Sequence, residues 1–100
     1  MLKLASAECF SRAVVAELKR VRTAKGFSQG LLAEATGLSR SAITMIENGQ
    51  RNPTLIVCQA LASALGVSLG GLLRRVEKAA EEQAAEARPD KTTARRSRRV

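Results

Sequence analysis

Apolar residues recur at helical spacing through most of the chain. Val14, Leu18 and Val21 repeat at intervals of four and three residues, with charged residues between them. This pattern is typical of a helix with one apolar face, and the alternation that marks a strand is missing. The pattern predicts an all-α fold of five helices, at about 11–25, 28–36, 39–48, 54–65 and from residue 68 onward.

Helix boundaries are marked by capping residues. A Gly follows each of the first four predicted helices, as expected where a helix ends in a left-handed residue. Typical N-cap residues precede three of the helices: Ser28, Ser39 and Ser68. For the fourth helix, Asn52 or Thr54 is the cap, with Pro53 in the first turn.

The fourth helix is predicted to have an apolar inner face and an apolar outer patch. We expect the inner face to consist of Leu55, Cys58, Leu61, Ala62 and Leu65. Ile56 and Val57 are expected to be exposed, as is Leu31 on the second helix. Together with Ala60, Leu69 and Leu72, Ile56 and Val57 would form a patch suited to a second copy of the chain.

Residues 29–48 have the residue types that two closely crossing helices require. Ala33 is small enough for one helix to cross another, and Gly37 lies in the turn, where a positive φ is costly for other residues. Apolar side chains occupy the remaining inner positions, except at Thr36, where an apolar residue would be usual. Two helices joined by so short a turn predict a helix-turn-helix.

Charge is distributed unevenly along the chain. The 100 residues carry a formal net charge of +8, and the pI is about 10.8. Residues 88–100 hold six basic residues and one acidic residue, so most of the excess lies there. Such a balance favours a polyanionic partner. We expect a disordered basic tail, either as a solvated terminus or as an arm that contacts phosphates.

Composition argues against several other classes of protein. The chain has no His, two Cys, and neither a nucleophile–base pair nor metal-ligand spacing. We therefore predict no enzymatic activity, no cofactor and no metal. No apolar run is long enough to span a membrane and no signal-peptide pattern is present, so a soluble cytoplasmic protein without membrane contact is expected.

Four segments resemble a known family. They are LKRVRTAKGFSQ, LLAEATGLSRSAITMIENG, RNPT and LASALGVSL, and they lie in register within about residues 14–73. The chain is similar to the Xre family, the phage repressor and Cro type of helix-turn-helix regulator. The resemblance implies a DNA-binding domain at 11–76. An N-terminal extension at 1–10, a helical extension at 77–87 and the tail at 88–100 would flank it.

The resemblance makes the third helix the recognition helix in the DNA major groove. Its outward residues would then read base edges: Arg40, Ser41, Thr44 and Met45. Arg40 could pair with guanine, and Met45 could touch a thymine methyl group. Two other interpretations remain open: Arg40 could contact a phosphate or only solvent, and Met45 could pack partly into the core.

The resemblance also implies contacts to the DNA backbone and one internal ion pair. Phosphate contacts are expected from Gln29, Ser39, Asn48, Arg51, Asn52 and Lys25. Gln29 could instead be solvated near the helix cap. Arg22 and Glu47 match a family pair that joins the first helix to the end of the third.

Two functions are compatible with these features. The first is sequence-specific binding of double-stranded DNA as a homodimeric repressor or self-regulating controller. The second is an antitoxin or bridging factor that acts mainly on a protein partner such as a toxin. Arg40 distinguishes them, because a reader of DNA needs this residue and a bridging factor does not.

Overall fold

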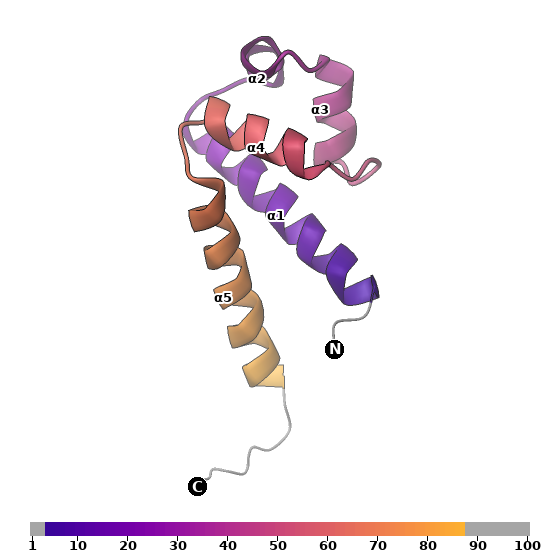
Figure 1. Ribbon diagram of the computed structural model, residues 1–100, viewed down its shortest axis with the longest axis vertical. Helices are drawn as coiled ribbons and strands as arrows, with labels where there is room; N and C mark the ends of the chain where they lie inside the picture. Colours follow the sequence, from indigo (N-terminus) through magenta and orange to yellow (C-terminus); the bar gives the residue numbers. More distant parts are fainter. Residues whose placement is uncertain (1–3, 88–100) are drawn as a thin grey trace, which may run out of the picture.

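The computed structural model describes residues 4–87, and within that range it contains five helices and no strands (Figure 1). The helices are α1 (Leu4–Ala24), α2 (Gln29–Thr36), α3 (Arg40–Glu47), α4 (Leu55–Ala64) and α5 (Leu69–Ala87). The all-α prediction is thus confirmed. The predicted disordered tail at 88–100 lies outside the described residues.

The two long helices, α1 and α5, pack against each other and carry the three short ones at one end (Figure 1). α1 begins seven residues before the predicted start at residue 11, because nothing in residues 4–10 breaks a helix. Phe10 packs against the core one turn before Val14, which extends the apolar face towards the N-terminus. α5 continues through residues 77–87 as predicted. The division of the chain into domains stays a prediction.

The core is aliphatic and draws on all five helices. Its most deeply buried large side chains are Ile43 of α3 and Leu72 of α5, which are 1% and 0% exposed. The other buried members of the cluster are Val14, Leu18, Val21, Leu32, Leu61, Ala62, Leu65 and Val76. α3 packs against α1, α4 packs against α5, and α2 packs against both α3 and α4.

The turn between α2 and α3 has the predicted geometry. Gly37 has a φ of 79°, and its N–H donates to the carbonyl of Ala33 at 2.9 Å. Thr36, the residue that departs from the apolar pattern, has a local role. Its hydroxyl donates to the carbonyl of Leu32 at 2.8 Å and accepts from the N–H of Leu38 at 3.3 Å. The polar residue therefore satisfies backbone groups at the end of α2.

Gly30 shows no comparable requirement. It is not among the glycines with positive φ, and a β-carbon there would meet only the Ser28 hydroxyl, at 3.9 Å. Neither backbone conformation nor packing explains a Gly in the first turn of α2.

Three predictions for α4 and the segment before it are wrong: Pro53 in the first turn, Leu55 on the inner face, and Val57 exposed at the surface. Thr54 caps the helix by accepting from the N–H of Val57 at 3.2 Å, so Pro53 precedes the cap and is not in the first turn. Leu55 is 72% exposed, whereas Val57 packs against the core. The inner stripe runs through Val57, Leu61 and Leu65, four residues apart, which turns Leu55 outward.

The predicted apolar patch is consequently much smaller. Leu72 is buried, and Val57 and Leu69 pack against the core. Leu55 and Ile56, which is 82% exposed, remain as an exposed apolar pair in the first turn of α4. Leu31 is exposed as predicted.

Within residues 4–87, no single helix has the length and apolar character needed to cross a bilayer. α4 and residues Leu69–Gln83 of α5 pass that test only as a pair, and the pair is bent by 108°.

Candidate nucleic-acid interface

α3 has two faces with different environments. Ala42, Ile43 and Ile46 are buried, and they fix one face of the helix in the core. Arg40, Ser41 and Met45 lie on the exposed side. These three residues and Thr44 together line an open surface hollow. The structure thus brings the four predicted base-reading residues to one place, although Thr44 is half-buried.

The predicted phosphate ligands near α3 lie at its two ends. Ser39 is exposed and caps the helix by accepting from the N–H of Ala42 at 3.0 Å. Asn48 ends the helix, and Arg51 and Asn52 follow in the loop, all three exposed. α3 is therefore flanked on both sides by polar side chains that are open to an external acceptor.

Lys25 is not part of this group. Its ammonium lies beside Gly66, where an added β-carbon would be 3.9 Å from Nζ. Gly66 follows α4, and Figure 1 shows that end of α4 well separated from α3. The structure therefore places Lys25 apart from the predicted phosphate ligands at the two ends of α3.

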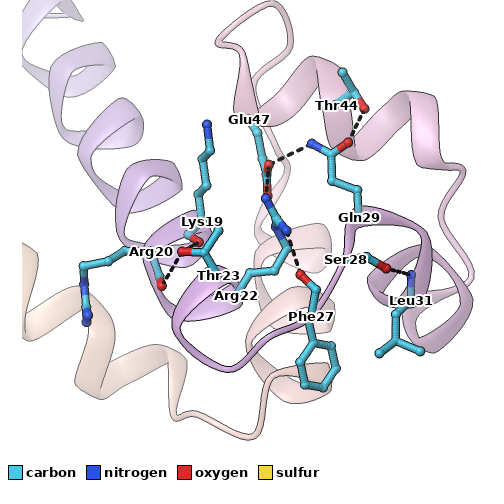
Figure 2. A network of polar contacts seen from close by, with 10 residues as sticks. All are labelled: Lys19, Arg20, Arg22, Thr23, Phe27, Ser28, Gln29, Leu31, Thr44 and Glu47. Atoms are coloured by element: carbon cyan, nitrogen blue, oxygen red, sulfur yellow. Dashed lines mark hydrogen bonds and ion pairs between the residues drawn. The ribbon is translucent and has the colours of Figure 1, made fainter.

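A buried ion pair fixes the C-terminal end of α3 to α1. Arg22 Nε donates to Glu47 Oε2 at 2.7 Å, and Nη2 donates to Oε1 at 3.0 Å. The two side chains are only 10% and 7% exposed. Arg22 Nη1 also donates to the carbonyl of Phe27 at 2.7 Å, which ties down the segment that leads into α2 (Figure 2). The predicted pairing of Arg22 with Glu47 is confirmed.

Gln29 connects this ion pair to the middle of α3. Its Nε2 donates to Glu47 Oε1 at 2.9 Å, and its Oε1 accepts from the Thr44 hydroxyl at 2.9 Å (Figure 2). In the same turn, Ser28 caps α2 by accepting from the N–H of Leu31 at 3.0 Å. Gln29 is thus held against α3 and is not a freely solvated side chain.

The Glu47 carboxylate is stabilised in its charged form. Burial by itself would raise its pKa, but hydrogen bonds from Arg22 and Gln29, with the charges of Arg22 and Lys19, outweigh burial and lower it. At neutral pH, Glu47 therefore acts only as an acceptor in this network.

The role of Thr44 in the network was not predicted from the sequence. Thr44 and Glu47 are three residues apart, so they share a face of α3 and can both reach one side chain. That spacing was the available signal. It could not identify Gln29 as the partner, because the contact depends on how closely α2 approaches α3.

The fold and these contacts define a helix-turn-helix domain of the phage repressor and Cro type. The family model described as helix-turn-helix matches residues 18–72, and the chain belongs to this family.

Named proteins are similar in sequence to part of this chain. An uncharacterized HTH-type transcriptional regulator, YqaF of Bacillus subtilis (strain 168), is 45% identical over 49% of this chain and 64% of its own length. The immunity repressor protein of Bacillus phage phi105 is 36% identical over 67% of this chain and 46% of its own length. The chain thus spans less than two thirds of the length of either relative.

A solved structure is also similar. The restriction-modification controller protein C.AhdI from Aeromonas hydrophila superimposes with a TM-score of 0.58 at 39% sequence identity. The match covers 64% of this chain and 96% of that protein. Similarity of both sequence and fold supports the membership of this chain in the family.

Proposed function

We propose that the protein binds specific sequences in double-stranded DNA and regulates transcription by occupying an operator. The observation that carries the proposal is the division of α3 into a fixed face and a free face. The buried face and the Glu47 ion pair hold the helix at one angle, while Arg40, Ser41 and Met45 remain exposed around one hollow. A polar helix face of this kind fits the major groove, where base edges are distinguishable.

The flanking residues would set the position of α3 on the DNA backbone. Gln29, at the N-terminus of α2, would donate to a phosphate beside N–H groups that favour anions. Ser39, Asn48, Arg51 and Asn52 would contact phosphates at the two ends of α3. Lys25, which lies apart from α3, is the weakest of the proposed contacts.

The names of the relatives support a regulatory role, since they include a transcriptional regulator, an immunity repressor and a controller protein. We further propose that the protein is cytoplasmic, not enzymatic, and acts as a homodimer. The exposed pair Leu55 and Ile56 offers an apolar surface to a second copy. Residues 88–100 would add phosphate contacts that are independent of sequence.

Selection of bound duplexes from a random DNA pool tests the proposal most directly. We expect a consensus with two-fold symmetry, whose half-site spacing reports the separation of the two recognition helices in a dimer. Failure to enrich any sequence would overturn sequence-specific binding, and an asymmetric consensus would argue against the homodimer.

Arg40→Ala tests whether α3 is the reading element. We expect the variant to lose about 1–3 kcal/mol of discrimination at one base position per half-site, while weak salt-sensitive binding remains. Arg12→Ala is the matched control, since Arg12 is an exposed cation of α1. Equal sequence preference in both variants would show that Arg40 does not read a base. Absence of any sequence preference in the unaltered protein would favour the alternative of an antitoxin or bridging factor that acts through a protein partner.

A further inference from the structure

The Gln29 side chain spans two positions on one face of α3. Thr44 Oγ1 donates to Gln29 Oε1 at 2.9 Å, and Gln29 Nε2 donates to Glu47 Oε1, also at 2.9 Å (Figure 2). Both ends of the carboxamide are therefore held by the recognition helix. Gln29 belongs to α2 and is proposed to contact a phosphate, but α3 positions its side chain.

The chemistry of the partners fixes the orientation of the carboxamide. A charged carboxylate can only accept, so the amide must turn its NH2 group towards Glu47. Its oxygen then faces the Thr44 hydroxyl, which donates. Glu47 is held in turn by Arg22 on α1, so this end of the network is fixed as well. One N–H of Nε2 is used on Glu47, and the other is available for an external acceptor.

The same contact leaves the Thr44 hydroxyl without a proton to donate to a base edge. Thr44 is half-buried, and its only donor proton is directed inward to Gln29. A hydrogen bond from this proton to a base edge would release the Gln29 carboxamide. Arg40 and Ser41 are exposed, and no hydrogen bond from either side chain to a described residue competes with a base.

We propose that Thr44 is a positioning residue, which holds the Gln29 amide in the orientation that meets a DNA phosphate, and does not read bases with its hydroxyl. The inference rests on the proposed function. It replaces the base-reading role predicted for the Thr44 hydroxyl by a role in affinity that is independent of sequence.

Duplex DNA carrying the selected consensus, and a panel of single-base variants of it, provide the probe. Thr44→Val removes the hydroxyl at nearly constant shape, and Thr44→Ser keeps it. We expect Thr44→Val to weaken binding to every duplex alike, by roughly 3- to 10-fold, with an unchanged order of base preferences. Thr44→Ser should bind with the affinity and preferences of the wild type.

The decisive readout is a double-mutant cycle with Gln29→Ala. If Thr44 acts through Gln29, Thr44→Val should cause no further loss of affinity in the Gln29→Ala background. A structural defect in α3 would weaken binding in either background, and that additive result would overturn the proposal. A changed base preference in Thr44→Val or Thr44→Ser would also overturn it, because it would show direct reading.

A measurement on the free protein separates this inference from the proposed function. In the NMR spectrum, the side-chain amide signals of Gln29 should shift in Thr44→Val and not in Thr44→Ser. Unshifted Gln29 signals in Thr44→Val would contradict the contact itself. Absence of DNA binding by the wild type would refute the proposed function, whereas wild-type binding with an additive cycle would refute only the role of Thr44.

Discussion

The two faces of α3 differ in almost every physical respect. On the inner face, Ile43 and Ile46 are buried, and Glu47 makes three hydrogen bonds to two other helices. On the outer face, Arg40 and Met45 line an open hollow. The eight residues of α3 thus include both the side chains that fix the orientation of the helix and the side chains that it exposes at the surface.

This difference separates stability from recognition along a single helix. Changes on the inner face should reduce the free energy of unfolding, and they should affect DNA binding only by moving the helix. Changes on the outer face should leave unfolding almost unchanged and act on binding directly. Thr44 lies between the two faces, which is why its role needed the tertiary contacts to be interpreted.

Removal of Glu47 should have the largest effect on stability. In Glu47→Ala the Arg22 guanidinium stays buried without its partner, and we expect a loss of about 3–5 kcal/mol in the free energy of unfolding, measured by urea denaturation. Glu17→Ala is the matched control, because Glu17 pairs with Arg20 and Arg75 at the surface and should cost at most about 1 kcal/mol. Similar losses in Glu47→Ala and Glu17→Ala would show that the buried ion pair stabilises the fold no more than the surface ion pairs do.

Acid should weaken the contacts that Glu47 makes on the inner face of α3. The pKa of Glu47 is lower in the folded state than its ordinary value of 4.5, so its contribution is present above that value and declines as the pH falls through the folded-state pKa. The free energy of unfolding should therefore fall below about pH 4.5, and more steeply in the wild type than in Glu47→Gln. Equal slopes between pH 5 and 2.5 would show that the pair does not contribute.

Met45→Ala should have the smallest effect on stability. Met45 is 38% exposed on the outer face, so we expect a change within about 0.5 kcal/mol in the same denaturation assay. A loss above about 2 kcal/mol would place Met45 in the core, as one interpretation of the sequence allowed.

Much of the fold could be predicted because the signals are local. The spacing of apolar residues, the N-cap Ser residues and the Gly that follows each short helix depend only on near neighbours in the chain. The pairing of Arg22 with Glu47 was predicted only because the chain resembles the family. The early start of α1 and the exposure of Leu55 were not predicted, because the spacing of apolar residues along the chain does not show which of them reach the core.

For this protein, the sequence by itself determined five helices, the tight turn at Gly37 and the polar start of α3. Only the tertiary structure decided which side chains of α3 are free. Packing of α2 against α3 turns the Thr44 hydroxyl towards Gln29. The fold also places the Lys25 ammonium beside Gly66, which follows α4. The physical reason is that a side chain's available donors depend on what lies within about 3 Å of it, and residues distant in the chain supply those partners.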